Sequence, residues 1–441
     1  MTTPISDFVK KYASQNKKRL HMPGHKGQGM LGVEKYDITE IGGADSLYEA
    51  SGIIAESEAN VSRIFGCKTL YSTEGSSQCI RAMVYLACVN SKGRPLILAG
   101  RNAHKTFLTA AAMLDCEVEW LCPQNGESYL ACTVTADYLE KKLISSEQKP
   151  DAVYITSPDY LGNVADVEGL SSVCRRFGVP LMVDNAHGAY LKFFPESKHP
   201  IDLGADICCD SAHKTLPVLT GGAYLHISPD APAGFALQAK NALALFGSTS
   251  PSYLILQSLD LANPIMENFA EEIKALAEKV AEAKNIFAEK GFAVSGSEPL
   301  KLTVSPKSVG YTGVEFADYC EQKGFVCEFA DEDYVVFMFA PNNGTDMPIE
   351  LASAVADIEK KTPLTVGAPE FRLPEKAMTI RQAALSASET IPVTESEGRV
   401  LAVPTVGCPP AVPIAACGEK IDKNTIERFL YYGITECTVV K

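Results

Sequence analysis

Short apolar segments alternate with amphipathic segments in the middle of the chain. Continuous apolar runs at 95–99, 152–156 and 179–183 are typical of parallel strands that are buried on both faces. Between the last two runs, the apolar spacing of residues 167–178 and the closing Gly178 predict a helix of about ten residues. This strand–helix–strand pattern predicts a parallel α/β sheet, in which ligands bind beyond the carboxyl ends of the strands.

The last third of the chain predicts a second, smaller unit. Residues 268–291 have the pattern of a long amphipathic helix rich in Ala, Glu and Lys, which would link two domains. Strand-like segments at 301–306 and 325–339 and a helix-like segment at 347–361 follow, as in a small α/β unit. The expected parts are an N-terminal arm at 1–50, a large domain at 51–285 and a small C-terminal domain at 286–441.

Composition excludes several classes of protein. The 441 residues are 46% apolar, enough to bury a large core, and the net charge of −14 disfavours a nucleic-acid partner. The amino-terminal segment has no apolar core of signal-peptide length, and no stretch approaches the roughly 18 apolar residues of a membrane span, so a cytoplasmic protein is expected. With no CxxC pair and no HExxH arrangement, no metal site is expected.

Polar residues follow three predicted strands, at 156–160, 184–188 and 210–214. A lysine amine can form a Schiff base with pyridoxal phosphate, and an acidic residue can keep the pyridine nitrogen protonated. Lys214 and Asp184 fit these two roles, although a strand-end Asp is often only a helix cap. The cofactor phosphate needs hydroxyl and backbone donors at the start of a helix. Such donors are supplied by Gly75, Ser76 and Ser77.

The sequence resembles the Orn/Lys/Arg decarboxylase family in a series of motifs that keep the family's order. The motifs are HMPGHKGQ (21–28), YDITEIGGADSLYEASGIIAESE (36–58), RNAHKTF (101–107), VDNAHGAY (183–190), SAHKTLPVLTGGAYLH (211–226) and STSPSYLILQSLD (248–260). A fainter likeness continues through 379–400 to 418–422. Only twenty residues precede the first motif. In this respect the chain resembles the family's short form, which has no N-terminal regulatory domain.

The resemblance implies a fold and a cofactor. Family members are pyridoxal-phosphate enzymes of the aspartate aminotransferase fold, so the expected fold is α/β with a mostly parallel central sheet and a smaller C-terminal α/β domain. The arm at 1–50 would carry the first motif, and the domain at 51–285 would bind the cofactor. Family members build their sites at a dimer interface, so a homodimer or higher homo-oligomer is expected.

The matching motifs also imply roles for individual residues. Lys214 would be the Schiff-base lysine and Asp184 the partner of the pyridinium nitrogen. His104 would stack on the pyridine ring, or be a core histidine, and Ala186 would be small because the ring packs against it. His187 would line the pocket or fix its turn. The groups expected near the phosphate are Gly75, Ser76, Ser77, Ser211 and His213.

The remaining assignments concern the neighbouring subunit and the proton transfer. Ser248 and Thr249 would reach a neighbouring subunit's cofactor phosphate, or be turn residues. Lys214 or a nearby histidine would return a proton to Cα, which makes Lys214, His104 and His213 the candidate catalytic residues.

The implied activity is decarboxylation of lysine, ornithine or arginine, which releases CO2 and a di- or polyamine. One alternative is an aminotransferase or another lyase on the same fold, and another is a non-catalytic homologue that binds the cofactor. An aminotransferase needs an arginine for the substrate carboxylate, and the available ones are Arg372, Arg381, Arg399 and Arg428. For the distal group of a basic substrate, the candidates are Glu40, Asp45 and Glu49, unless they only form a solvated face.

The sequence departs from the family pattern at four positions. In CPPAVPIAACGE (408–419), Ala411 replaces a turn glycine and Cys417 replaces a proline, so the backbone there is expected to differ. Glu74 precedes Gly75 where asparagine or glycine is more usual, and its carboxylate must point away from a phosphate. Asn185 stands where the family often has glutamate.

Overall fold

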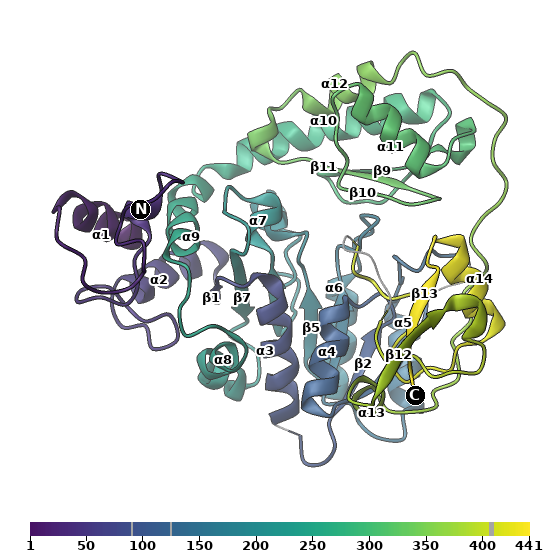
Figure 1. Ribbon diagram of the computed structural model, residues 1–441, viewed down its shortest axis with the longest axis horizontal. Coiled ribbons are helices and arrows are strands. Elements are labelled where there is room, and N and C mark those ends of the chain that lie inside the picture. Colours follow the sequence, from purple (N-terminus) through teal and green to yellow (C-terminus); the bar gives the residue numbers. More distant parts are fainter. Residues whose placement is uncertain (90, 124–125, 405–409) are drawn as a thin grey trace. The chain divides into compact units, whose positions relative to one another are not determined.

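The computed structural model describes residues 1–89, 91–123, 126–404 and 410–441 and separates the chain into two compact units (Figure 1). The first unit comprises Met1–Asn90 and Cys174–Glu271, and the second comprises Ser91–Val173 and Glu272–Lys441. Each unit is therefore built from two separate stretches of the chain. The domain boundaries expected at residues 50 and 285 stay a prediction.

The first unit contains four strands in the order β1-β7-β6-β5. β5 and β6 are parallel, whereas β7 runs antiparallel to both β6 and β1. Asp184 pairs with Cys209 in register, and Cys208 pairs with His226. Because side chains alternate between the faces of a strand, Cys209 lies on one face and Cys208 and Asp210 on the other. The bounds are β1 Lys68–Ser72, β5 Leu181–Asp184, β6 Ile207–Asp210 and β7 Ala223–Ile227.

Helices pack around these four strands. α3 contacts β6 and β7, α2 contacts β1, and α1 and α2 both contact α9, while α8 packs on α3. Gly66 ends α2 in the left-handed conformation, as a glycine commonly does after a helix. The bounds are α1 Pro4–Ser14, α2 Ile53–Phe65, α3 Gly75–Val89, α7 Ala212–Thr215, α8 Ala233–Phe246 and α9 Tyr253–Met266, with the short 3-10 helices η1 Glu34–Tyr36 and η2 Ala189–Phe193.

The second unit contains three parallel strands in the order β4-β2-β3, and a separate antiparallel sheet in the order β10-β11-β9-β8. The bounds of the strands are β2 Leu96–Gly100, β3 Glu117–Leu121, β4 Ala152–Thr156, β8 Ala293–Ser295, β9 Lys301–Ser305, β10 Phe329–Ala330 and β11 Val335–Met338. The bounds of the helices are α4 Lys105–Leu114, α5 Ala136–Ser145, α10 Phe269–Glu289, α11 Gly313–Gln322 and α12 Met347–Ala354, with η3 Pro306–Val309 and η4 Pro341–Asn343. α6, Val167–Phe177, runs from the second unit into the first.

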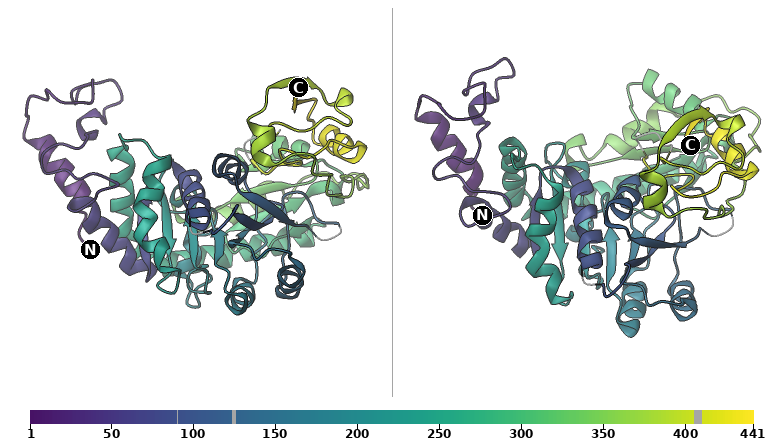
Figure 2. Two further views of the ribbon diagram at one scale, coloured as in Figure 1. Left: turned by 90° about the horizontal axis from the view of Figure 1, so that it is seen from below. Right: turned by 60° about the horizontal axis from the view of Figure 1, so that its bottom comes forward.

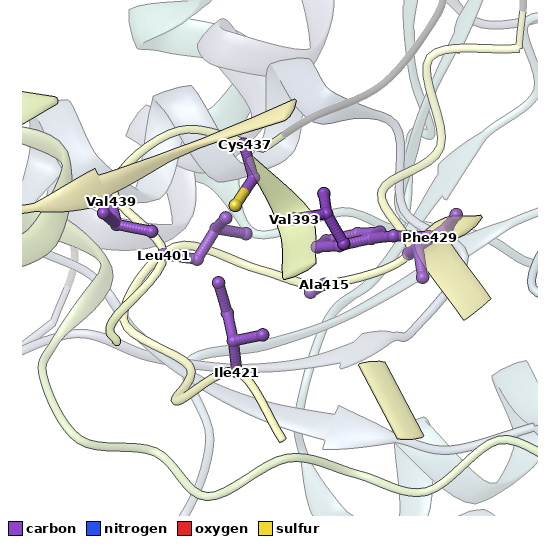
Figure 3. Close-up of a cluster of buried hydrophobic side chains, with 8 residues drawn as sticks. Val393, Leu401, Ala415, Ile421, Phe429, Cys437 and Val439 are labelled. Carbon is purple, nitrogen blue, oxygen red and sulfur yellow. The ribbon is translucent and has the colours of Figure 1, made fainter. Parts of the chain in front are cut away.

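The C-terminal segment, yellow in Figure 2, pairs β12 with β13 as an antiparallel ribbon. Figure 3 shows the apolar cluster beneath it, in which Phe429 of α14 and Leu401 are fully buried. The bounds are α13 Ile380–Ala384, β12 Ser388–Pro392, η5 Val393–Glu395, α14 Lys423–Tyr431 and β13 Glu436–Val440. No helix among the described residues has both the length and the apolar content to cross a membrane.

The predicted elements of the central α/β region are confirmed. The apolar runs form β2, β4 and β5, and the patterns at 167–178 and 268–291 form α6 and α10. The helix expected over 347–361 ends at Ala354 instead. Beyond the helix, the backbone N–H of Lys361 donates to the carbonyl of Val309, the last residue of η3, at 3.0 Å.

Candidate functional site

Lys214 stands where β6 ends, on the short helix α7. Its Nζ lies 2.7 Å from Nε2 of His187, which is 5% exposed and follows β5. The two adjacent strands β5 and β6 therefore bring an amine and an imidazole into direct contact. Such a pair can hold and exchange one proton.

Asp184 is the last residue of β5 and is 2% exposed. Its Oδ1 accepts a hydrogen bond from the backbone N–H of Ala186 at 3.2 Å and one from Sγ of Cys209 at 3.6 Å. A buried carboxylate with these weak neutral donors can still accept a strong hydrogen bond from a cationic N–H. Ala186 is half-buried in the turn between Asp184 and His187.

The predicted phosphate loop begins α3. Oγ of Ser211 donates to Oγ of Ser76 at 2.8 Å, so the loop before α3 meets the turn before Lys214. Gly75 has a φ of +70°, and a Cβ placed there would lie 4.0 Å from Cε1 of His213. Ser76 and Ser77 occupy the first turn of α3, where backbone N–H groups and the helix dipole favour an anion.

Sequence reasoning missed the glycine pair Gly221 and Gly222, which holds this loop in place. The backbone N–H of Gly75 donates to the carbonyl of Gly221 at 2.7 Å, and the backbone N–H of His213 donates to that of Gly222 at 3.1 Å. Gly221 has a φ of +97°, and a Cβ on it would lie 2.9 Å from the carbonyl oxygen of Thr73. Adjacent glycines inside the motif at 211–226 were the available signal, since glycine permits both the left-handed backbone and the close approach.

Whether Glu74 points away from a bound phosphate stays a prediction. Its side chain is exposed, and its Oε1 accepts a hydrogen bond from the backbone N–H of Ser248. Ser248 and Thr249 are themselves exposed, and Oγ of Ser248 accepts from the backbone N–H of Ser250 at 3.1 Å. Glu74 therefore holds the segment that carries the two residues assigned to a neighbouring subunit.

His104 belongs to the second unit, in which it is the N-cap of α4. Its Nδ1 accepts from the backbone N–H of Thr106 at 3.1 Å and lies 2.9 Å from Oγ1 of the same residue. These contacts fix the ring at the start of the helix. Its stacking on a pyridine ring stays a prediction.

The acidic stretch considered for the substrate's distal group has other functions. The carboxylate of Asp45 accepts five backbone hydrogen bonds, two of them from Ile54 and Ala55 in the first turn of α2. Burial raises the pKa of Asp45, but these backbone donors lower it further than burial raises it. Glu40 and Glu49 are exposed. Asp45 is therefore a helix cap, and the other two carboxylates lie on a solvated face.

Ala411, in the altered tail, has a backbone conformation that favours glycine. Ala411 has a φ of +56°, and its carbonyl accepts from the backbone N–H of Lys105 at 2.8 Å. Ala411 thus adopts the left-handed region despite its Cβ, and the expectation that the backbone here differs from the family's stays a prediction. Cys417 is 5% exposed. The first two residues of this motif, Cys408 and Pro409, lie outside the described residues.

An aminotransferase would need one arginine for the substrate carboxylate, and three of the four candidates already interact with other groups of the chain. Arg381 donates to the carbonyls of Ala112 and Met113, both at 3.0 Å. Arg399 pairs with Glu389 at 2.7 Å, and the guanidinium of Arg428, 3% exposed, stacks 5.0 Å from the ring of Phe371. Arg372 is exposed.

The donor set of the first unit fits pyridoxal phosphate. The hydroxyls of Ser76 and Ser211 and the start of α3 suit a phosphate, the amine of Lys214 suits an aldehyde, and the buried carboxylate of Asp184 suits a protonated ring nitrogen. The hydrogen bond between Ser76 and Ser211 and the contact between Lys214 and His187 link these groups into one set.

Comparison with known proteins agrees with this chemistry. The family model described as "Orn/Lys/Arg decarboxylase, major domain" matches residues 3–293. The arginine decarboxylase of Bacillus subtilis (strain 168) is 29% identical over 96% of this chain and 92% of its own length. The uncharacterized protein YaaO of the same strain is 28% identical over 97% of this chain and 94% of its own length.

Solved structures share the fold. The lysine decarboxylase LdcF of Francisella novicida superposes with a TM-score of 0.79 at 18% identity, over 100% of this chain and 81% of that one. The constitutive lysine decarboxylase of E. coli gives a TM-score of 0.76 at 19% identity, over 100% and 82%. The predicted α/β class with a mostly parallel central sheet is confirmed by these likenesses.

Proposed function

Because the chain belongs to the Orn/Lys/Arg decarboxylase family, whose members are pyridoxal-phosphate-dependent carboxy-lyases, we propose that it removes the carboxylate of a basic amino acid as CO2. The products are CO2 and the corresponding di- or polyamine, and one proton replaces the carboxylate on Cα. The observation that carries this proposal is the contact of 2.7 Å between Nζ of Lys214 and Nε2 of His187, beside the turn that begins at Asp184.

We assign the cofactor contacts to the first unit. Lys214 would bind the aldehyde carbon, and Asp184 would accept the hydrogen bond of the ring nitrogen. Ala186 leaves room for the ring. The donors to the phosphate would be Gly75, Ser76, Ser77, Ser211 and His213. His104, from the second unit, keeps its proposed place on the ring face.

The bound cofactor withdraws electrons from Cα, which lets the carboxylate depart. Lys214 then delivers the proton that Cα needs, and His187 supplies it to Nζ, since these two atoms are already in hydrogen-bond contact. His187 is buried, which limits exchange of its ring protons with water. His213 is held through Nδ1 by the carbonyl of Gly222 at 2.9 Å, which favours a fixed role at the phosphate over proton transfer.

The substrate class follows from the relatives. Relatives from Bacillus subtilis and Halalkalibacterium halodurans that align over 96% of this chain are named arginine decarboxylases, and arginine is therefore the first substrate to test. We further propose a homodimer or higher homo-oligomer in the cytoplasm, in which Ser248 and Thr249 reach the cofactor phosphate of the neighbouring subunit. Their exposure leaves them accessible to a second copy.

One experiment separates the rival activities. The purified protein is incubated with pyridoxal phosphate and with arginine, lysine or ornithine, and CO2, amine and keto acid are measured. Amine and CO2 in equal amounts support decarboxylation, whereas keto acid indicates an aminotransferase. Bound cofactor without turnover indicates a non-catalytic homologue. Borohydride trapping followed by peptide mapping must place the cofactor on the peptide that contains Lys214, and Lys214→Ala must abolish the adduct.

A further inference from the structure

A buried carboxylate lies behind the candidate site, on the opposite face of the sheet from Cys209. Asp210, the last residue of β6, is fully buried and stands four residues before Lys214. Its Oδ1 accepts from Nδ2 of Asn185 at 2.6 Å. Its Oδ2 accepts from Nε2 of His199 and from Nε2 of His226, each at 3.1 Å. Three side-chain donors from separate parts of the first unit therefore converge on one carboxylate.

This carboxylate stays ionised. Burial raises the pKa of Asp210, but the two imidazoles more than offset burial, so that the pKa lies below its usual range. Burial lowers the pKa of His226, and its Nδ1 lies 2.9 Å from Oγ1 of Thr69. A neutral ring that donates through Nε2 and accepts from a hydroxyl through Nδ1 accounts for both contacts of His226.

Asn185 connects this carboxylate to the turn of the candidate site. It follows Asp184 directly, its backbone N–H donates to the carbonyl of Cys209 at 3.0 Å, and its own carbonyl accepts from Gly188 at 2.8 Å. A Cβ on Gly188 would lie 2.1 Å from Oδ1 of Asn185, so the side chain fills the inside of the turn. The side chain of Asn185 therefore anchors the turn at 184–188 from the inside, and Asp210 holds that side chain.

We propose that Asn185 and Asp210 form a positioning pair that fixes, from the opposite face of the sheet, the turn presenting Asp184 and His187 to the cofactor. The inference rests on the proposed function. The pair acts through geometry, because the bond of 2.6 Å between Asn185 and Asp210 ties together the two strands that carry the site. Loss of this bond frees the turn and leaves a buried carboxylate with one donor fewer.

The side chains around Asp210 also include a possible set of ligands for a cation. His199, Cys208 and Asp210 offer ligand atoms within 4.8 Å of one another. Both imidazole Nε2 atoms, however, already point at Oδ2 of Asp210 at hydrogen-bond distance, and burial raises the pKa of the Cys208 thiol, so it is a neutral thiol. Hydrogen bonds therefore account for this cluster without an ion. The experiment below also measures whether a metal is bound.

The test exchanges the charge within the pair. Asn185→Asp keeps the shape of the side chain but places two carboxylates in contact. Asp210→Asn combined with Asn185→Asp restores a donor and an acceptor, because the new amide donates to residue 185 while its oxygen still accepts from the imidazoles. Asn241→Asp, at an exposed position of α8, makes the same chemical change away from the site and is the matched control.

The dissociation constant for pyridoxal phosphate is measured by absorbance titration at one neutral pH, with circular dichroism and thermal unfolding of each cofactor-free protein. We expect Asn185→Asp to weaken cofactor binding at least about tenfold. The double variant should return to within about threefold of the wild type, and Asn241→Asp should bind as the wild type does. Two results would contradict the proposed positioning pair. One is an unchanged affinity of Asn185→Asp for pyridoxal phosphate, and the other is a loss of affinity that the double variant does not restore.

Two further readouts keep the result unambiguous. If Asn185→Asp does not fold, Asn185→Ala replaces it; this variant must fold and bind cofactor more weakly, and unchanged binding overturns the pair. Elemental analysis of the wild type must show no stoichiometric metal that disappears in Asp210→Asn, since such an ion would overturn the hydrogen-bonded assignment. A wild type that binds no pyridoxal phosphate contradicts the proposed function itself, whereas normal wild-type binding with an indifferent variant contradicts only this inference.

Discussion

Nζ of Lys214 lies 2.7 Å from Nε2 of His187, although 27 positions separate the two residues in the sequence. The amine follows β6 and the imidazole follows β5, so two adjacent parallel strands bring these two groups into hydrogen-bond contact. In the proposed reaction, this contact gives Lys214 a direct proton donor.

We expect His187→Gln to keep its affinity for pyridoxal phosphate and to lower kcat about a hundredfold, because Lys214 loses the ring that supplies its proton. Cofactor titration and the rate of CO2 release measure the two quantities separately. His187→Ala should be no better than His187→Gln. A kcat equal to that of the wild type would show that Lys214 receives its proton from another group.

The contact between Gly221 and the phosphate loop predicts a second loss. Gly221→Ala would place Cβ 2.9 Å from the carbonyl oxygen of Thr73 and 3.0 Å from Cδ1 of Ile255, at a φ of +97°. We expect about 1 to 3 kcal/mol of destabilisation and a weaker affinity for pyridoxal phosphate, because the loop must move away. Chemical denaturation and cofactor titration measure both effects.

The matched control for this substitution is Gly66→Ala. Gly66 has a φ of +71°, but the nearest neighbour of its Cβ would be Nζ of Lys192 at 4.0 Å, the far end of a flexible side chain. Gly66→Ala should therefore lose stability through backbone strain and leave cofactor affinity unchanged. Equal losses of cofactor affinity in both variants would contradict the role given to Gly221.

Local chemistry predicted part of the site, and long-range contacts supplied the rest. Lys214 and Asp184 could be nominated for the candidate site because an amine and a carboxylate after buried strands suit a parallel sheet, and their roles stay predictions. The bond between Ser76 and Ser211 joins residues 135 positions apart, and no local pattern indicates it. The orientation of Glu74 could be stated only as a requirement, since its partner is the backbone of Ser248.

The same distinction applies to the fold. Apolar runs predicted β2, β4 and β5, because strands covered on both faces need continuous apolar residues. The helix-like pattern continues to Lys361, so it did not indicate the early end of the helix at Ala354. Asn185 likewise gave no sign of its partner, since Asp210 lies on the neighbouring strand.

Asp159 predicts a dependence of stability on pH. Burial raises the pKa of this carboxyl from 3.8 to about 6, although its two oxygens accept from the backbone N–H and the Nδ2 of Asn163. Because folding raises this pKa, the protonated carboxyl stabilises the folded state at pH values below the pKa that the group has in the unfolded chain. This contribution is lost as the pH rises through the higher pKa of the folded state. Asp159 should therefore remove about 2 to 3 kcal/mol of unfolding free energy between pH 4 and about 6.

Asp159→Asn isolates this contribution, because the amide cannot ionise. The unfolding free energy of the variant minus that of the wild type should rise with pH across this window and level off above it. Asp357→Asn, at an exposed position, should give a flat difference. Chemical denaturation at a series of pH values measures both curves. Parallel curves for Asp159→Asn and the wild type would show that the group ionises at its ordinary pKa.

Ala411 carries backbone strain that a glycine would release. The left-handed region costs a residue with a Cβ roughly 1 to 2 kcal/mol, and Ala411 occupies it at a φ of +56° while its carbonyl accepts from the backbone N–H of Lys105. Glycine adds about 0.5 to 1 kcal/mol of entropy cost, so Ala411→Gly should stabilise the protein by about 0.5 to 1 kcal/mol. Ala415→Gly, at a buried alanine without positive φ, should destabilise it instead. Denaturant midpoints of the two variants measure the contrast, and a loss of stability in both would show that the Cβ of Ala411 contributes more by packing than it costs in strain.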